Sequence, residues 1–299
     1  MIIIVTYNGL KWIDKCLESC KDYPVVVVDN NSSDNTVEFI KEKFPTVHLI
    51  EQQKNLGFGQ ANNIGISYAL NHGADYVFLL NQDAYLVGSC LEKSIEIHQK
   101  NKQFGVLSPV HLNGDGTHLD HNFSNYVGKN RDFYSDHVLN KSLKNIYEVP
   151  FVNAAGWLIS RKCLETVGGF DPIFFHYGED DNYCHRVRYH EFKIGVIPKS
   201  CIKHDRVQKS VIKSESLDLK ERKYKVEYAN PARKDFEQQF YNKLQLAKRS
   251  IFKNMFMLRF SKLKSLKKHL KMLLRIQEEI LNSREITSKP GAHFLRINE

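Results

Sequence analysis

Short apolar, β-branched runs alternate with helical segments through the first hundred residues. The apolar runs lie at 2–5, 25–29, 47–51 and 76–80, and segments of helical periodicity separate them at 10–20, 33–43 and 60–71. Runs of this kind are typical of strands buried on both faces of a parallel sheet, in which helices form the crossovers. The N-terminal part is therefore predicted to be an α/β domain, with a Rossmann-like, mostly parallel sheet flanked by helices.

Polar residues follow three of these predicted strands at the point where each strand ends. They are Thr6, Tyr7 and Asn8, then Asp29 to Asn31, then Asn81 to Asp83. Ligands of open α/β sheets bind beyond the carboxyl ends of the strands. The sequence therefore predicts a binding site at this edge. A helix cap is the alternative role for Asp29, although Asp34 suits that role better, and a packed ring is the alternative for Tyr7.

The chain changes character after about residue 107. Residues 108–150 are polar and are predicted to form loops with weak strands, whereas 151–160 and 193–197 are typical of strands and 179–190 of a helix. Beyond residue 206 the pattern is long, charged and helical. We expect one domain over 1–207 and a basic, mostly helical C-terminal extension over 208–299.

The positive charge of the chain is concentrated in this extension. The net charge is +9, yet residues 238–277 hold eleven Lys or Arg and no Asp or Glu. An amphipathic stripe runs through the same segment at Phe256, Leu263, Leu266, Leu270 and Leu273. Three roles are open: docking of 243–275 on an anionic membrane surface, packing of helices within one chain or between subunits of a homo-oligomer, and binding of nucleic acid. No nucleic-acid-binding motif accompanies the charge, so that partner is not expected.

Several classes of protein are excluded by composition and motif. A hydrophobic content of 42% excludes wholesale disorder. No apolar run reaches the ~18 residues of a membrane span, the start is not typical of a signal peptide, and the six cysteines form no CxxC pair. We therefore expect a cytoplasmic protein with reduced thiols. A single glycine follows the first strand, so the GxGxxG fingerprint of dinucleotide binding is absent there.

Two further motifs have residue types that suit the binding of an anionic ligand and acid–base chemistry. Gly57 and Gly59 precede a predicted helix, where glycine permits positive φ and a helix N-terminus favours anionic groups; an ordinary loop is the alternative. Glu179, Asp180 and Asp181 begin another predicted helix. Adjacent carboxylates raise one another's pKa, which suits a general base, and acidic residues also favour a helix N-terminus for purely structural reasons.

These motifs occur in an order that resembles a known family. The segments VTYN, VVVDNNSSDNT, NLGFGQANNIG, FLLNQDA, GWLISRKCLETVGGFD and GEDDNYCHRVR, followed by His204, are similar to family 2 glycosyltransferases with the GT-A fold. Among these the chain most resembles rhamnosyltransferase-like members. The resemblance covers about residues 1–207, and it implies an inverting enzyme that uses a nucleoside diphosphate sugar, with UDP- and dTDP-sugars the expected donors.

The resemblance also implies roles for individual residues. The donor nucleotide would contact residues at the strand ends and in the glycine loop: Thr6, Tyr7, Asn8, Asp29, Asn31, Asn55, Gly57, Phe58, Gly59, Asn62 and Asn81. A divalent metal, Mn²⁺ or Mg²⁺, would be held by Asp83 and His204. Asn81 stands where the family has the first Asp of its DxD motif, which weakens that motif because an amide carbonyl carries no formal charge.

The catalytic base implied by the resemblance is Asp180, with Asp181 as the rival. Glu179, Asp181 and Trp157 would contact donor or acceptor sugar, although a core position is the alternative for Trp157. The acceptor would be a glycan or lipid-linked hydroxyl in bacterial surface polysaccharide synthesis, with the protein cytoplasmic or peripheral on the inner face of the plasma membrane. The alternatives are a nucleotidyltransferase of related fold, which would typically have a basic glycine-rich loop after the first strand, and a non-catalytic sugar- or nucleotide-binding module, which would need no base.

Overall fold

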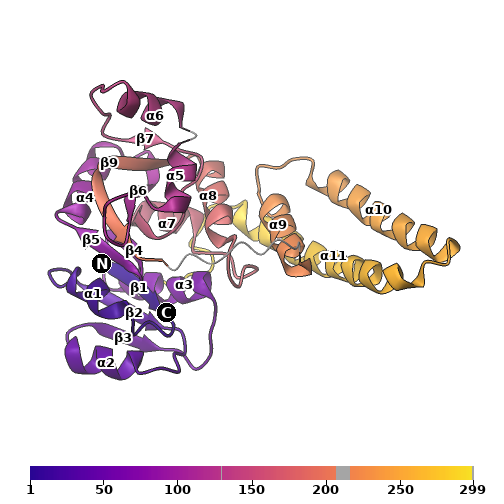
Figure 1. Ribbon diagram of the computed structural model, residues 1–299, viewed down its shortest axis with the longest axis horizontal. Coiled ribbons are helices and arrows are strands. Elements are labelled where there is room, and N and C mark those ends of the chain that lie inside the picture. Colours follow the sequence, from indigo (N-terminus) through magenta and orange to yellow (C-terminus); the bar gives the residue numbers. More distant parts are fainter. Residues whose placement is uncertain (129, 207–215, 298–299) are drawn as a thin grey trace.

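The computed structural model describes residues 1–128, 130–206 and 216–297, and these contain one nine-stranded sheet. The strand order is β3-β2-β1-β4-β8-β6-β9-β5, with β7 paired to β9. The strands are β1 (Ile2–Thr6), β2 (Val25–Asp29), β3 (His48–Glu51), β4 (Tyr76–Asn81), β5 (Ala84–Val87), β6 (Phe104–Asn113), β7 (Tyr147–Glu148), β8 (Gly156–Ser160) and β9 (Lys193–His204). Helices flank both faces of this sheet (Figure 1).

The first four strands are parallel, as the alternating pattern predicts. Ile2 of β1 pairs with Val25 of β2 and with Phe78 of β4. Their crossovers include α1 (Ile13–Glu18), α2 (Thr36–Lys43) and α3 (Phe58–Asn71). Asn35 is the N-cap of α2, and the preceding Asp34 accepts hydrogen bonds from the amide and hydroxyl of Thr36, so Asp34 and not Asp29 satisfies an amide at this helix start.

The two faces of the sheet carry separate hydrophobic cores. Ile3 points into a core with α3, α5 (His121–Val127), α7 (Arg161–Val167) and α8 (Glu179–Tyr189). Ile2 and Ile4 point into the opposite core, which contains side chains of α1, α2 and α4 (Cys90–Lys100). This alternation follows from the period of two in a strand and explains why the runs are apolar throughout.

The second half of the sheet is mixed, and the expectation of loops over 108–150 is wrong. Strand β6 runs to Asn113, and helices α5 and α6 (Arg131–Val138) follow it. Both helices are short and bury few apolar side chains, so their periodicity is weak. Asp120 caps α5 by accepting from the amides of Asn122 and Phe123.

Two strand boundaries also differ from the sequence expectation. Only Gly156–Ser160 of the segment 151–160 is a strand, and it runs antiparallel to β4. The returning strand β9 does not end at residue 197 but continues to His204, because a register shift between Pro109 and Val110 of β6 lets residues 201–204 continue the pairing. This longer strand also pairs with β5, which brings His204 opposite Ala84.

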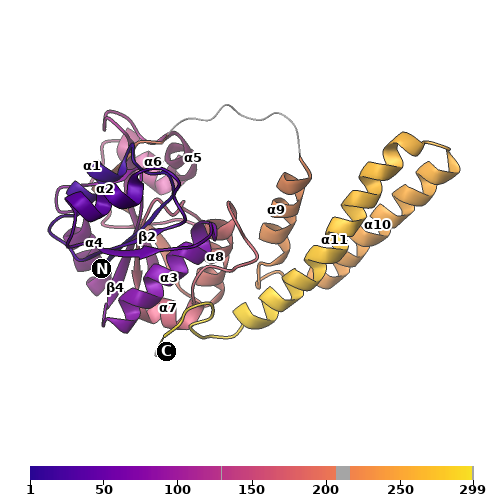
Figure 2. The ribbon, with the colours of Figure 1, turned by 90° about the horizontal axis from the view of Figure 1, so that it is seen from below.

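The C-terminal residues form a short helix and a long hairpin. Helix α9 (Leu217–Tyr228) is followed by α10 (Phe236–Phe256) and α11 (Phe260–Thr287), which extend together away from the sheet (Figures 1 and 2). The predicted domain boundary between 207 and 208 lies outside the described residues. Residues 291–296 return to the sheet domain, where Gly291 donates to the Thr166 carbonyl and the Arg296 amide to the Ser67 hydroxyl.

The hairpin buries much of the predicted amphipathic stripe. Leu273 is fully buried and Leu270 partly buried in a core shared by α9, α10 and α11, and Leu263 is also buried. Phe256 is instead 84% exposed. The structure therefore favours packing within the chain for most of the stripe. In the described part of the chain, no helix combines the length and apolarity needed to cross a bilayer.

Candidate active site

The carboxyl ends of β1 and β4 meet around the side chain of Gln82. The Gln82 Oε1 atom accepts from the Thr6 hydroxyl at 2.7 Å and from the Tyr7 amide at 2.9 Å. Thr6 is fully buried, whereas the Tyr7 side chain is exposed. Thr6 therefore supports the carboxyl edge of the sheet from within the protein, and the Tyr7 side chain is exposed to contact a ligand.

Asp29 and Asn8 organise the turn that follows β2. Both oxygens of the buried Asp29 carboxylate accept from Ser32, from its amide at 2.9 Å and its hydroxyl at 2.5 Å. Asn8 has a φ of 50° and its side chain accepts from the Ser33 amide at 2.8 Å. Asn31 has a φ of 69° and is exposed. Left-handed backbone at two asparagines is consistent with a tight, pre-formed turn.

Asn30 fastens the glycine loop to this turn. Its side chain donates to the Asn55 side chain at 3.0 Å and to the Gly57 carbonyl at 3.2 Å, and accepts from the Leu56 amide at 2.8 Å. Gly57 has a φ of 81°, and a Cβ placed there would lie 1.8 Å from the Phe175 carbonyl oxygen. The close approach that Gly57 permits is thus to another loop of the protein.

The start of α3 contacts the start of α8 at Gly59. A Cβ on Gly59 would lie 2.8 Å from Cβ of Phe170 and 3.6 Å from Cβ of Glu179. Phe58 packs edge-on against Phe170, while the buried Asn62 side chain donates back to the Phe58 carbonyl. This packing places the predicted donor loop beside the acidic motif.

Asp83 and His204 are brought together by the pairing of β5 with β9. Asp83 Oδ1 lies 3.3 Å from His204 Nε2, and the Asp205 amide donates to the Asp83 carbonyl at 2.7 Å. Burial alone would raise the pKa of the Asp83 carboxyl, but the hydrogen bond from His204 and the charge of Arg206 lower it on balance. The two predicted metal ligands are therefore neighbours.

Asp120 and Arg206 surround the other face of His204. Arg206 Nη2 lies 3.1 Å from His204 Nδ1, and Arg206 Nε lies 3.0 Å from Asp120 Oδ2. Since a guanidinium can only donate, Nδ1 accepts here and the ring hydrogen is on Nε2. Asp120 Oδ2 lies 3.8 Å from Nδ1. When a metal ion binds Nε2, the ring hydrogen would be on Nδ1, and the Asp120 carboxylate would accept a hydrogen bond from it.

The donors at this position fit a hard divalent ion that also binds a substrate diphosphate. Within the described ranges no cluster of three or more His, Cys, Asp or Glu side chains could hold a metal ion alone. Asp83 and His204 offer two ligands, and the Asn81 side-chain oxygen is buried without a hydrogen-bond partner among the described residues. Phosphate oxygens and water would complete the six ligands that Mg²⁺ prefers.

The acidic motif forms the first turn of α8. Burial, then the charge of Asp180, raises the pKa of Glu179 to about 8; burial, then the charge of Asp181, raises the pKa of Asp180 to about 6. Burial also raises the pKa of Asp181. The Asp180 Oδ1 atom accepts from the Asp181 amide at 2.9 Å, which fixes the direction of this carboxylate.

A groove of about 1390 Å³ opens in front of Asp180 and Asp181. Aromatic side chains line it on one wall, among them Tyr126, Tyr147 and Phe151, and α9 forms another wall with Arg222 and Lys223. Burial, then the charge of Asp180, raises the pKa of Tyr126 to about 12. The Arg222 guanidinium lies over the Tyr177 ring at 5.0 Å. The C-terminal extension is thus part of the wall that faces the acidic motif.

Residues 1–168 match the profile of "Glycosyl transferase family 2", which spans more than half of the chain. The chain belongs to this family. The resemblance predicted from the motifs is confirmed, and the protein is a glycosyltransferase; the nucleotidyltransferase and binding-module alternatives are not favoured.

Curated relatives of this family 2 glycosyltransferase include enzymes of glycan synthesis. The "dTDP-rhamnosyl transferase RfbF" of Shigella flexneri is 28% identical over 216 residues, covering 70% of each chain. The "Low-salt glycan biosynthesis hexosyltransferase Agl10" of Haloferax volcanii is 26% identical, covering 65% of this chain and 63% of the relative. The "N-acetylglucosaminyl-diphospho-decaprenol L-rhamnosyltransferase" of Mycobacterium tuberculosis is 22% identical, covering 60% and 67%. Two of these names support the rhamnosyltransferase-like assignment.

Solved structures confirm the GT-A fold. S. aureus TarS in complex with UDP matches with a TM-score of 0.55 and 15% identity, over 78% of this chain and 65% of that one. GalNAc-T7 with UDP, GalNAc and Mn²⁺ matches with a TM-score of 0.57 and 15% identity, over 96% and 57%. The glycosyltransferase spans less than two thirds of the Haloferax relative and of both solved chains.

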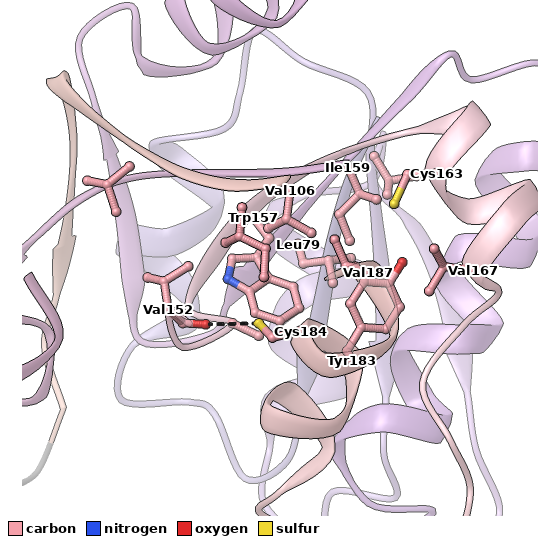
Figure 3. Packing of buried hydrophobic residues seen from close by; sticks show 14 of the residues in the cluster. Leu79, Val106, Val152, Trp157, Ile159, Cys163, Val167, Tyr183, Cys184 and Val187 are labelled. Atoms are coloured by element: carbon pink, nitrogen blue, oxygen red, sulfur yellow. Dashed lines mark hydrogen bonds between the residues drawn. The ribbon is translucent and has the colours of Figure 1, made fainter. Parts of the chain in front are cut away.

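Trp157 of the glycosyltransferase lies in the hydrophobic core. Its ring is fully buried and stacks on Phe170 with centroids 6.1 Å apart, and it packs among Leu79, Val106 and Tyr183 (Figure 3). A side chain enclosed in this way has no surface for a sugar. The structure therefore favours the core alternative that the sequence left open.

Four residues that organise the site were not singled out from sequence. Gln82 and Asn30 fasten the turns, Asn63 holds the Phe170 backbone through two hydrogen bonds of 2.7 Å, and Asp120 faces His204. Asn30 and Gln82 lie inside motifs that drew attention to their neighbours. Asn63 likewise lies inside the quoted segment NLGFGQANNIG, whereas the contact of Asp120 with His204 joins distant segments and has no local signal.

Proposed function

We propose that the protein transfers a hexose or deoxyhexose from a UDP- or dTDP-sugar to an acceptor hydroxyl with inversion at the anomeric carbon, in bacterial surface polysaccharide synthesis. The observation that carries this is Asp180, a carboxylate with a pKa raised to about 6 that faces a large groove and lies one residue from the Glu179–Gly59 contact with the donor loop. A base with a pKa near neutrality is suited to take a hydroxyl proton.

The donor nucleotide would bind along the carboxyl edge of the sheet. The side chains of Tyr7, Asn8 and Asn31 would contact the nucleotide there. The turns beneath the nucleotide would be held in place by a second set of residues: Thr6, Asp29, Asn55, Gly57, Phe58, Gly59 and Asn62. The UDP in the solved TarS complex and the dTDP-rhamnosyl name of the Shigella relative support a nucleoside diphosphate donor. Most of these residues are thus positioning residues whose hydrogen bonds pre-form the pocket.

A divalent metal, Mn²⁺ or Mg²⁺, would be held by Asp83 and His204, with Asn81 as a neutral neighbour. When bound it supplies charge stabilisation for the departing diphosphate. Asp120 would hold His204 in the tautomer that leaves Nε2 free. The Mn²⁺ in the solved GalNAc-T7 structure supports a metal in this fold.

Asp180 would accept the proton of the acceptor hydroxyl as its oxygen attacks the anomeric carbon. The new C–O bond forms on the face opposite the bond to the diphosphate, which breaks, so the configuration inverts. Glu179 is neutral at pH 7 because its pKa is raised to about 8, and it would offer a hydrogen bond to a sugar without adding charge beside the base. Asp181 would contact the acceptor sugar.

The acceptor would occupy the groove between the acidic motif and α9. Its aromatic lining suits the apolar faces of a sugar, and its volume of about 1390 Å³ exceeds what one monosaccharide needs. We therefore propose a GT-A domain over 1–207 and an extension over 208–299 that completes the acceptor site. A lipid-linked glycan at the inner face of the plasma membrane fits a cytoplasmic protein whose extension is basic.

Release of nucleoside diphosphate tests this function. A panel of UDP-, dTDP- and GDP-sugars with Mn²⁺ or Mg²⁺ should show turnover with a UDP- or dTDP-sugar, and NMR of the product should show the inverted anomer. Retention of configuration would refute the single displacement, and turnover that is indifferent to chelation would refute the metal.

A further inference from the structure

The tip of the α10–α11 hairpin is covered by apolar side chains that contact little of the protein. We call this the hairpin tip, and it consists of Phe252, Met255, Phe256, Met257, Leu258 and Phe260. Phe256 is 84% exposed and Leu258 71%, and the other four are exposed as well. Such a contiguous cluster of large apolar side chains marks an interaction site on a soluble protein.

The turn at the hairpin tip has a conformation that does not favour leucine. Leu258 has a φ of 55°, in the left-handed region where glycine or asparagine is most stable. The Leu258 amide donates to the Met255 carbonyl and the Arg259 amide to the Asn254 carbonyl, so the turn is well formed. A leucine at this position therefore presents an apolar side chain outward at a conformational cost.

No part of the described chain covers the hairpin tip. The core shared by α9, α10 and α11 is confined to the base of the hairpin, where it includes Phe240, Leu244, Leu273 and Ile276. Both views show the hairpin extending away from the sheet with its tip at the far end (Figures 1 and 2). The hairpin tip is thus accessible to a lipid bilayer or to another molecule.

Basic side chains lie at the hairpin tip and along both helices that lead away from it. They are Lys248, Arg249 and Lys253 on α10, Arg259 at the turn, and Lys262, Lys264, Lys267, Lys268 and Lys271 on α11. Residues 238–277 contain no acidic residue, and within the described ranges none of these nine forms an ion pair with a carboxylate. An apolar end beside unpaired positive charge is complementary to an apolar layer beneath anionic headgroups.

We propose that the hairpin tip inserts into the acyl boundary of an anionic lipid bilayer while the basic side chains contact its headgroups. This inference rests on the proposed function, in which the protein is peripheral on a membrane. It places the membrane contact at the hairpin tip and not along the amphipathic stripe of α11, which α10 covers. A second copy of this chain is a poor occupant, because two such tips would bring their positive charges together.

Vesicle co-sedimentation of the full-length protein tests the insertion. Vesicles of phosphatidylglycerol and phosphatidylcholine should bind the protein at low salt and release it in 1 M salt, where the Debye length falls to ~3 Å. The pair Phe256→Ser and Leu258→Ser should reduce the partition coefficient roughly 100-fold. The control Leu246→Ser removes a side chain of α10 that is 61% exposed but lies outside the hairpin tip, and it should leave partitioning unchanged.

Single tryptophans report where the hairpin contacts the lipid. Phe256→Trp should show a blue shift with anionic vesicles and quenching by brominated acyl chains. Tyr241→Trp, ~22 Å away along α10 and also exposed, should show neither. Turnover with a soluble acceptor should be unchanged in the serine variants. Absence of turnover in wild type and variants alike would count against the proposed function and not against the insertion.

Three outcomes would overturn the insertion. They are no binding of the full-length protein to anionic vesicles at low salt, equal binding of the serine variants and wild type, and equal blue shifts at the two tryptophan positions. Light scattering that shows a concentration-dependent dimer abolished by the serine substitutions, without vesicle binding, would assign the hairpin tip to a protein interface.

Discussion

Asp83 Oδ1 and His204 Nε2 lie 3.3 Å apart, with Asp83 in the turn directly before β5 and His204 at the end of β9, which runs antiparallel to β5. The pairing of Ala84 with His204 fixes this distance, and the Asp205 amide extends the same ladder to the Asp83 carbonyl. His204 is the last residue of β9 and Asp83 directly precedes β5, so the pairing of these strands holds the two residues beside each other at the proposed metal site.

Removal of either side chain should weaken metal-dependent donor binding. Asp83→Ala should have the larger effect because it removes the charged oxygen, and His204→Ala a smaller one; Asn81→Ala should matter least. Calorimetric titration of UDP or dTDP with and without Mn²⁺ measures these affinities. Asp14→Asn, an exposed carboxylate paired with Lys43, is the control. Identical curves for Asp83→Ala and wild type would contradict the metal assignment.

Asp180→Asn should lower turnover by ~10²–10⁴-fold while donor affinity stays close to that of wild type. The reason is that the proposed base acts on the acceptor hydroxyl, whereas the donor binds along the sheet edge. Asp181→Asn should have a smaller effect. Single-turnover kinetics with a fixed donor separates the two, and near-normal turnover of Asp180→Asn would move the role to Asp181.

The same carboxylate predicts the acid limb of the pH profile. Because the pKa of Asp180 is raised to about 6, kcat should fall as the pH drops below about 6 and the base becomes protonated. The residual activity of Asp180→Asn should lack this limb. An unchanged limb in the variant would mean that another group controls it.

Glu179 should make stability depend on pH. Its pKa rises from 4.5 in the unfolded chain to about 8 in the fold, so the folded state binds more protons between those values. The contribution of Glu179 is therefore fully present below pH 4.5 and is lost as the pH rises through about 8. The free energy of unfolding of Glu179→Gln, relative to wild type, should increase by more than ~1 kcal/mol from pH 5 to pH 8.

Urea denaturation at several pH values measures this difference. Glu38→Gln, at an exposed position on α2, is the control and should show no such trend. A constant difference between Glu179→Gln and wild type across the range would mean that Glu179 is ionised in the fold.

Gly57→Ala should destabilise the protein more than Gly73→Ala. Both glycines have positive φ, 81° and 78°, so alanine strains the backbone by about 1–2 kcal/mol at each. At Gly73 nothing lies within 4 Å of the new Cβ, whereas at Gly57 the Phe175 carbonyl oxygen would be 1.8 Å away. A further ~1–3 kcal/mol is expected at Gly57. Chemical denaturation compares the two, and equal losses would show that the glycine loop can move away from Phe175.

The sequence by itself determined the parallel half of the sheet and the position of its binding edge. Apolar runs buried on both faces, with helices between them, depend on local pattern, and β1, β2 and β4 follow that pattern closely, whereas β3 is only partly buried. The acidic start of α8 and the glycine loop were also readable, because each motif needs only a few adjacent residues. The family resemblance then linked these motifs to one chemistry.

Tertiary structure alone decided which distant groups meet. Strand β9 continues to His204 because β5 and β6 pair with its residues 201–204, and that pairing sets the Asp83–His204 distance. Trp157 is enclosed because α7 and α8 pack over β8, and Leu273 faces α10 instead of solvent for the same kind of reason. The local sequence pattern indicates only whether a side chain or a segment is apolar or polar. The partner that buries the side chain or extends the strand comes from elsewhere in the chain, and only packing selects it.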